Sequence, residues 1–338
     1  MSKLYFLTLF LIYSYSLFGQ ESFILSGYIT DVETNEKLIG VNVLLPALNL
    51  GTTTNEYGFY SISIPNGDQE LLFSYLGFKN FTEKINLLED KILNIKLFPE
   101  VELLEEVVVK DNLELINLRS PQMSVNSLAI NTIKKMPAAL GEVDIIRSIT
   151  LLPGVTNGGE GASGFNVRGG AVDQNLILLD EAIIFNSSHL FGFFSVFNPD
   201  AIKDIKLFKG GIPANYGGRV SSVLNIYQKD GNSNDFSAEG GVGLISSRLL
   251  LEGPLKKEKG SFLIGGRSSY VHLFLPLIES VKDNKAYFYD LNTKVSYTID
   301  TKNNLYLSGY FGRDVFDISN LFNNAYGNSV ANFRWNHL

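Results

Sequence analysis

After residue 232, apolar and polar side chains alternate over segments that are longer than the strands of most soluble domains. Residues 289–299, 305–311 and 331–336 place mainly aromatic and aliphatic side chains at one set of alternate positions and mainly polar side chains at the other. Because successive side chains of a strand point to opposite sides, each segment has one apolar face and one polar face. A strand that crosses a bilayer as part of a water-filled barrel needs both faces and about 9–11 residues. The pattern therefore predicts membrane-crossing strands.

The connections between these segments indicate how the strands are ordered. Outer-membrane barrels have short turns on the periplasmic side and longer loops outside. Residues 256–260 and 300–304 form tight connections, whereas the connections around residues 274–285 and 316–328 are long. We expect the two long connections to face outward.

These connections predict about six strands. If the chain enters the first strand from the periplasmic side, residues 235–255 form two strands bent near residues 244–247, and residues 329–338 form the sixth. The smallest outer-membrane barrels have about eight strands, and open strand edges are not tolerated in lipid. We therefore hypothesise that the chain is an N-terminal fragment, and that residues 233–338 are the start of a truncated transmembrane β-barrel.

The N-terminus has the pattern of a secretory signal peptide. Lys3 precedes an apolar run over residues 4–18, and small residues, Ser16 and Gly19, lie near the predicted cleavage after residue 19. The alternative, a membrane anchor, is disfavoured because the run is shorter than the roughly 20 residues of a spanning helix. The chain has 0 cysteines, which excludes a disulfide scaffold and a thiolate metal site in the exported protein.

Residues 20–98 predict a small β-sandwich, because apolar residues alternate and turn residues recur about every 8–12 positions. Asn66 and Gly67 are a signal for a hairpin with a type I′ turn. The segment resembles the carboxypeptidase-regulatory-like, prealbumin-type sandwich at Gly27, Asp31, Gly40, Val41, Val43, Gly51, Thr52, Thr54, Asn55, Gly58, Phe59, Leu76, Gly77 and Phe78. That resemblance implies a non-catalytic module.

Residues 99–110 are a predicted linker that carries a short β-prone segment. Two acids are followed by three β-branched residues, namely Glu105, Glu106, Val107, Val108 and Val109. Such a segment can pair with the edge of another protein's sheet. It resembles the coupling box of TonB-dependent outer-membrane receptors, which implies capture by the periplasmic TonB protein. The alternative is an ordinary last strand of the sandwich.

Residues 111–232 predict a mixed α/β domain with short elements. Acids near residue 142 and apolar residues at helical spacing predict an amphipathic helix that Pro153 and Gly154 end. A capping Asn198 followed by Pro199 predicts a second, shorter helix. The predicted short strands are residues 165–168, 176–179 and 205–208.

Residues 159–164 match the GxGxxG pattern of dinucleotide-binding folds. That chemistry requires a strand before the glycines and a helix N-terminus after them, so that backbone amides converge on a pyrophosphate. Here a predicted helix end precedes the glycines and a strand-like segment follows them. The prediction is therefore no nucleotide site and no cofactor.

A longer ordered set of residues resembles the plug domain of TonB-dependent receptors. It comprises Leu152, Pro153, Gly154, Val155, Phe165, Asn166, Val167, Arg168, Gly169, Gly170, Leu178, Leu179, Asp180, Asn198, Pro199, Gly210, Gly211, Tyr216, Gly217, Gly218, Arg219, Val220, Ser221 and Ser222. One departure is Glu181, where the family pattern has glycine. The resemblance implies that a barrel, which has 22 strands in this family, surrounds residues 111–232.

A plug must touch the wall of its barrel through hydrogen bonds and still be movable. Glycines allow close backbone approach, and arginines are forked donors for wall carboxylates. The predicted plug–barrel contacts are Arg168, Gly169, Gly170, Asp180, Gly217, Gly218 and Arg219. The alternative is that both arginines are solvated surface charges.

Ligand contact is expected on the outer apex of the plug. The candidate residues are Asn186, Ser187, Ser188 and His189. A lone histidine such as His189 is more often structural than a ligand or a general base.

The predicted function is TonB-dependent, plug-gated uptake of a nutrient ligand across the outer membrane of a Gram-negative bacterium. The alternatives are an outer-membrane surface binding or adhesion protein without transport and a secreted hydrolase, for which no HExxH or GxSxG motif is present. Expected partners are TonB, outer-membrane lipids and an unknown external ligand such as a siderophore, oligosaccharide, peptide or vitamin. A surface lipoprotein partner is compatible with the resemblance, although no residue indicates one. With 28 basic and 35 acidic residues the net charge is −7, so nucleic acid is not expected to bind.

Overall fold

The computed structural model describes residues 22–100, 125–134, 136, 142–158, 164–319 and 321–338. The chain divides into two compact units, residues 1–33 with 37–104 and residues 34–36 with 105–338. The predicted signal peptide, residues 1–19, and the predicted coupling box, residues 105–109, lie outside the described residues.

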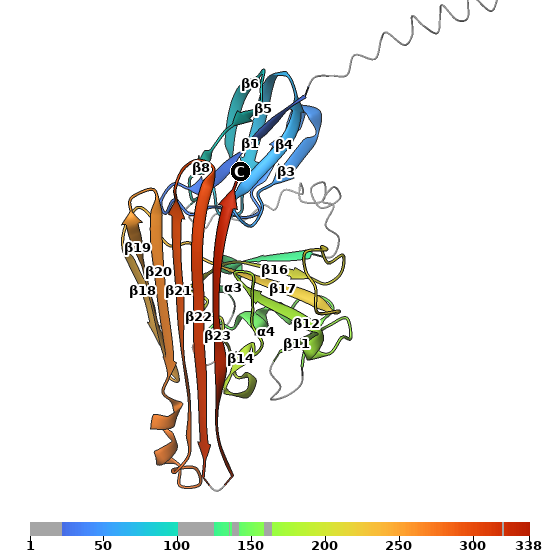
Figure 1. The fold of residues 1–338 in the computed structure, drawn as a ribbon. Helices are drawn as coiled ribbons and strands as arrows, with labels where there is room; N and C mark the ends of the chain where they lie inside the picture. The colour runs from blue at the N-terminus through green and yellow to red at the C-terminus, as the bar shows by residue number, and fades with distance from the viewer. Residues whose placement is uncertain (1–21, 101–124, 135, 137–141, 159–163, 320) are drawn as a thin grey trace, which may run out of the picture. The chain divides into compact units, whose positions relative to one another are not determined.

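The first unit is a two-layer β-sandwich, as the alternation predicted (Figure 1). One sheet has the order β3-β2-β5-β6, and in the other β1 lies between β4 and β7 and also pairs with β8. Fully buried side chains such as Leu25, Ile29, Val43 and Phe73 fill the space between the sheets. The strands are β1 (Ser22–Asp31), β2 (Asn42–Leu45), β3 (Leu50–Thr53), β4 (Phe59–Pro65), β5 (Gly67–Ser74), β6 (Phe81–Leu87), β7 (Lys91–Ile92) and β8 (Ile95–Leu97).

The hairpin predicted at Asn66 and Gly67 is wrong. Strand β4 pairs with β1, whereas β5 pairs with β2 and β6, so the chain crosses from one sheet to the other at this point. A type I′ turn needs positive φ at both central residues, and of this pair only Gly67 has it, at 105°. The glycine serves a crossover between layers instead of a hairpin.

The second unit begins with an α/β domain, residues 125–232, built on a five-stranded sheet of order β13-β12-β17-β16-β9. Strands β12 and β17 are parallel, and their side chains are buried along their whole length. The strands of the sheet are β9 (Val125–Ala129), β12 (Asn175–Leu179), β13 (Ala182–Ile183), β16 (Ile202–Phe208) and β17 (Ser222–Gln228). Two small hairpins accompany it, β10 (Val155–Asn157) with β11 (Phe165–Val167) and β14 (Ser188–His189) with β15 (Phe194–Ser195).

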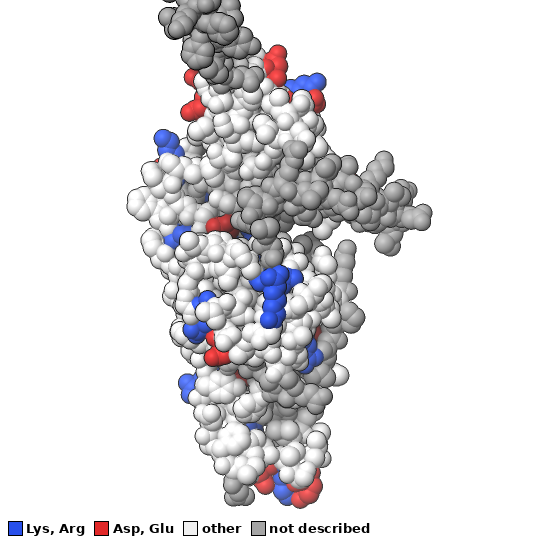
Figure 2. All heavy atoms as spheres, turned by 90° about the vertical axis from the view of Figure 1, so that its right-hand side faces the viewer, with Lys and Arg blue, Asp and Glu red and all other residues white. Residues whose placement is uncertain are grey.

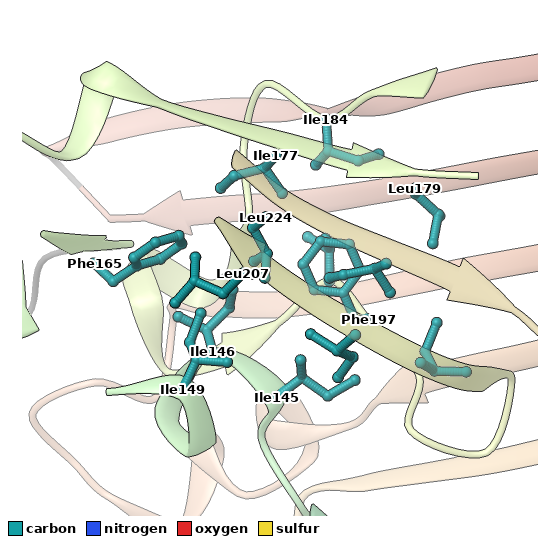
Figure 3. Packing of buried hydrophobic residues seen from close by; sticks show 14 of the residues in the cluster. Ile145, Ile146, Ile149, Phe165, Ile177, Leu179, Ile184, Phe197, Leu207 and Leu224 are labelled. Carbon is teal, nitrogen blue, oxygen red and sulfur yellow. The ribbon is translucent and has the colours of Figure 1, made fainter. Parts of the chain in front are cut away.

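The core of this domain lies between the sheet and two short helices, α3 (Ile130–Lys134) and α4 (Ile145–Ile149). Figure 3 shows Ile145, Ile146 and Ile149 facing Leu207 and Leu224 of the sheet. The apolar residues of the first predicted helix therefore pack into the core, although the helix is only 5 residues long. The described part of the chain contains no helix that is both long and apolar enough to cross a membrane.

The second helix predicted after Asn198 is wrong. Residues 198–201 form a turn in which the amide of Ala201 donates to Asn198 O at 3.1 Å, and the Asn198 side chain accepts from the amide of Asp200 at 3.1 Å. Strand β16 starts directly afterwards, at Ile202. The Asn-Pro pair thus caps a single turn, because the next residues pair with β17 and β9.

The chain ends in an antiparallel sheet of six strands, which confirms the predicted number (Figure 1). They are β18 (Ser237–Val242), β19 (Ser246–Lys256), β20 (Gly260–Ser269), β21 (Lys285–Thr298), β22 (Asn303–Ile318) and β23 (Phe322–His337). The long connection after β20 contains two short 3₁₀ turns, η4 (Val271–Leu273) and η5 (Leu275–Leu277).

The long connection predicted around residues 316–328 is wrong. Strand β22 continues to Ile318 and pairs with Phe322 at the start of β23, so the connection is short and the sixth strand starts before residue 329. Asparagines and a glycine in residues 323–328 resemble a loop in composition, but cross-strand pairing with β22 keeps them extended.

Burial in the six-stranded sheet is the reverse of that in a soluble protein. Apolar residues of one face are exposed, for example Leu307 at 52% and Phe333 at 66%. Polar residues of the other face are buried against the α/β domain, for example Asn292 at 0% and Lys294 at 2%. An exposed apolar face of this size suits contact with lipid, and the polar face suits a hydrated interior.

Candidate functional site

Charged side chains gather where the α/β domain meets the polar face of the sheet. Arg267 of β20 is 3% exposed and donates from Nε and Nη2 to Asp290 Oδ2 of β21 at 2.8 and 2.6 Å. Its Nη1 pairs with Glu142 of the α/β domain, and Nη2 also donates to Ser195 O at 2.8 Å. One guanidinium therefore joins two sheet strands to two segments of the domain, and its forked donors suit this arrangement.

A second group centres on His189 in β14. Its Nδ1 lies 2.7 Å from Asp314 Oδ2 of β22, and its Nε2 lies 3.2 Å from Asp290 Oδ2 and 3.2 Å from the Tyr310 hydroxyl. The ring stacks on Phe288 with centroids 4.3 Å apart. A histidine expected at an exposed apex is thus only 1% exposed and bound to the sheet.

A third group surrounds Lys294 of β21. Its Nζ lies 3.1 Å from Asp180 Oδ2 and 2.9 Å from Asp230 Oδ1, and it donates to Gln228 O at 2.9 Å. Burial raises the pKa of Asp230, but Lys203 and Lys294 together hold that pKa well below its ordinary value. Asp230 is therefore a carboxylate that links β16 of the α/β domain to β21 of the sheet.

A more exposed group lies near β18 and β19. Asp200 Oδ2 accepts from Arg248 Nε at 2.6 Å, and Asp200 Oδ1 lies 3.0 Å from Lys134 Nζ. Burial raises the pKa of Asp200, yet the two cations lower it overall. Figure 2 shows charged side chains of both signs in separate small groups on a face that is otherwise mostly uncharged.

The α/β domain also presents a small cavity of about 110 Å³ beside α4. Arg147 and Phe193 line it and are exposed, and the backbone at Phe191 is left-handed with φ 56°. The Ser188 hydroxyl, which also lines it, has no hydrogen-bond partner among the described residues. The cavity thus combines a guanidinium, aromatic rings and an unused hydroxyl.

Asp180 and Glu181, where the sequence departs from the family pattern, form a turn. Leu179 pairs with Ala182, and the two residues between them have φ 46° and 72°, as a type I′ hairpin requires. Glycine would adopt φ 72° without strain, so Glu181 is an unusual occupant. Its carboxylate lies 3.2 Å from Nη1 of Arg334 in β23.

Two substitutions of Glu181 should separate backbone strain from the ion pair. We expect Glu181→Val to destabilise the domain by about 2 kcal/mol, because a β-branched residue at this φ adds strain. Glu181→Gly should change stability by less than about 1 kcal/mol, because relief of strain offsets a half-exposed ion pair and the entropy of glycine. Denaturant unfolding measures the stability of each variant against the parent. Equal stabilities of Glu181→Val and Glu181→Gly would contradict the assignment of strain.

Of the predicted plug–barrel contacts, the structure places Asp180 against the six strands. Besides Lys294, the side chain of Asn332 donates to Asp180 O. Arg168, Gly169, Gly217, Gly218 and Arg219 are exposed in this chain, and Arg219 Nη1 donates to Gly218 O on its own loop at 3.0 Å. Gly170 packs close to Ser221, where an added Cβ would lie 2.2 Å from the hydroxyl oxygen. Contacts of the exposed residues with a barrel wall stay predictions.

The four predicted apex residues lie at the contact with the sheet. Ser187, Ser188 and His189 are buried, and Asn186 exchanges hydrogen bonds with Asn328 of β23 at 3.2 and 2.7 Å. A ligand would reach their side chains only after the domain moved away from the sheet.

The sheet residues of the site were missed by the sequence analysis. Arg267, Asp290, Lys294 and Asp314 are ionisable residues on the polar face of predicted membrane strands. Ionisable residues within membrane segments are costly and usually functional, so their position in the alternation was a usable signal. Their partners, such as Glu142, could not be inferred from it.

Comparison with known proteins agrees with this architecture. A model of the CarboxypepD_reg-like domain matches residues 25–109, and a model of the TonB-dependent receptor plug domain matches residues 118–223. The chain belongs to the TonB-dependent receptors. The α/β domain is its plug, held against the first strands of a barrel wall.

Two curated relatives come from Formosa agariphila. TonB-dependent receptor P39 is 26% identical over 201 residues, which are 57% of this chain and 18% of the relative. TonB-dependent receptor P3 is 34% identical over 84 residues, which are 25% of this chain and 8% of the relative. The receptor chain thus spans a small part of the length of either relative. Among solved structures, the siderophore receptor PirA from Acinetobacter baumannii has a TM-score of 0.44 at 20% identity, covering 59% of this chain and 32% of that one.

Proposed function

We propose that the protein takes up a nutrient ligand across the outer membrane of a Gram-negative bacterium, with the plug as the gate. The observation that carries this proposal is the buried set of ion pairs between plug and sheet, behind a sheet face that is apolar and exposed. Polar contacts can be broken and remade in water, so they suit a plug that must close a pore and still move. Outer-membrane lipids would cover the apolar face.

Energy for plug movement would come from TonB, which would bind residues 105–109 by adding a strand. Two acids followed by three valines have the composition for this β-augmentation. The sandwich domain model extends to residue 109, so the alternative of a last sandwich strand shares the same residues. We propose the boundaries 20–98, 99–110 and 111–232 for sandwich, linker and plug.

A disulfide-crosslinking experiment tests this coupling role. The sequence has 0 cysteines, so the Val107→Cys variant would carry a single thiol. We expect it to crosslink to a single cysteine placed in the strand-binding edge of a periplasmic TonB domain, and Leu88→Cys, exposed at 72% on the sandwich, not to crosslink. Equal crosslinking of the two variants would argue against the coupling role.

Deletion of residues 105–109 separates transport from surface binding. In the complete receptor we expect the deletion to abolish energy-dependent accumulation of the ligand and to leave binding to cells unchanged. Unimpaired accumulation would refute coupling through this segment. Absence of accumulation in the parent receptor as well would favour a surface binding or adhesion protein.

Ligand contact would start at the cavity beside α4. Arg147 and Phe193, which line the cavity and are exposed, offer charge and stacking to a small polar group. The buried residues 187–189 would become accessible once the plug shifts.

A further inference from the structure

Both ring nitrogens of His189 face carboxylates of the barrel strands. Nδ1 lies 2.7 Å from Asp314 Oδ2, and Nε2 lies 3.2 Å from Asp290 Oδ2. A neutral imidazole has one N–H, so it can donate to only one of them. The imidazolium donates to both, and the geometry therefore fits the charged ring.

The charges around the ring favour the same state. Arg267 of β20, Asp290 of β21, Asp314 of β22 and Glu142 of the plug lie in this group, and the Tyr310 hydroxyl of β22 also faces the ring. With charged His189 the group has two cations and three anions, 2 − 3 = −1, and with neutral His189 it has 1 − 3 = −2. A second uncompensated negative charge at a buried site would be costly.

The backbone next to the ring is built around this contact. The amide of Leu190 donates to Asp314 Oδ1 at 2.8 Å, and Leu190 and Phe191 have φ 50° and 56°. Two successive non-glycine residues in the left-handed region are strained, and such strain persists only where surrounding contacts hold it. Loss of the Asp314 contacts should therefore release the whole β14–η3 segment, where η3 is Leu190–Gly192.

We propose that His189, as an imidazolium bonded to Asp290 and Asp314, is the positioning residue that latches the plug to the barrel wall, and that withdrawal of the plug releases its proton. This inference rests on the proposed function for its consequence in transport. Its test uses neither ligand nor TonB, so the latch and the transport role can fail separately.

The pH dependence of the latch follows from linkage. Burial lowers the pKa of His189, but the hydrogen bonds to Asp290 and Asp314 raise it more, so the pKa in the seated plug is above the ordinary value of 6.5. The latch is therefore at full strength below the ordinary pKa and is lost as the pH rises through the raised pKa. Between these two values, plug withdrawal is accompanied by proton release.

Hydrogen exchange of the complete receptor in detergent measures the latch. The readout is the protection factor of backbone amides in residues 186–196, corrected for the intrinsic pH dependence of exchange. In a titration from about pH 6 to about pH 10 we expect protection to fall as the pH passes through the raised pKa of His189, because the imidazolium then loses its proton. Constant protection over this range would overturn the proposal.

Three variants assign the effect to His189. His189→Gln should have low protection at both ends of the titration, whereas His189→Lys, which keeps a cation, should stay protected at about pH 9. His272→Gln is the matched control, because His272 lies in the connection after β20, where its ring contacts Tyr287. The His272→Gln variant should retain the pH dependence of the parent. A pH-dependent loss in His189→Gln equal to that of the parent would overturn the assignment.

If the His189→Gln receptor does not assemble, a substitution of Asp314, the hydrogen-bond partner of His189, tests the same contact. Asp314→Asn leaves the histidine in place and removes one of its two acceptors. We expect the midpoint of the protection loss to move to lower pH. An unchanged midpoint would contradict a latch through Asp314.

Discussion

An Arg267→Met receptor is expected to conduct ions and admit large hydrophilic solutes without any ligand, because its plug is no longer held closed. The substitution keeps most of the buried volume and removes the cation that joins Glu142 to Asp290. Removing one partner of a buried ion pair costs about 3–5 kcal/mol, since the remaining charges are left uncompensated. Domain stabilities are only about 5–15 kcal/mol, so this loss should populate an unseated plug. Conductance of the purified complete receptor in planar bilayers measures the leak.

Arg248→Met is the matched control for this leak. Arg248 lies in the adjacent strand and also pairs with a plug carboxylate, Asp200, but its side chain is 25% exposed and Asp200 keeps Lys134. We expect a loss of about 1 kcal/mol or less and no measurable conductance. Adding Glu142→Gln to Arg267→Met should reduce the leak, because it removes one of the two stranded charges. An Arg267→Met receptor as tight as the parent would show that the guanidinium does not hold the plug.

The strand pattern of the barrel wall was predictable because lipid and water impose alternation on every residue of a spanning strand. Six strands and a bend near residues 244–247 were predicted from that alternation and from the lengths of the connections, and the structure has six strands with the turn at residues 243–245. Residues 322–328 were not predictable in the same way, since their asparagines favour loops locally and only pairing with β22 keeps them in a strand. The helix predicted after Asn198 is wrong for a similar reason. The residues that would continue the helix pair with neighbouring strands as β16 instead.

The site itself was only half predictable. Asp180 was predicted as a plug–barrel contact and His189 as a ligand contact. The partner of Asp180 is Lys294 and that of His189 is Asp314, each more than a hundred positions away in sequence. No local pattern connects such pairs, so one sequence without relatives cannot assign them. His189 was expected at the outer apex as one of four candidate ligand contacts, and its burial became evident only from the facing aspartates.

A Lys294→Met receptor should be the most acid-sensitive of these variants. Lys294 is 2% exposed between Asp180 and Asp230, and both carboxylates lose their shared cation in the variant. We expect a loss of about 3–5 kcal/mol near neutral pH, measured by denaturant unfolding of the plug. The pKa of Asp230 is held below its ordinary value in the parent, so its stabilising contribution is lost only as the pH falls through that lowered pKa.

Without Lys294 that pKa should rise, because burial then acts against Lys203 alone, and the loss of stability should begin at a higher pH. Lys282→Met, which breaks an exposed pair with Glu279, is the control and should change stability by less than about 0.5 kcal/mol at any pH. Asp180→Asn combined with Lys294→Met should recover part of the loss, since one stranded carboxylate is removed together with its partner. A Lys294→Met receptor whose stability and acid sensitivity matched the parent would mean that the contact between plug and wall depends on Arg267 and His189 instead.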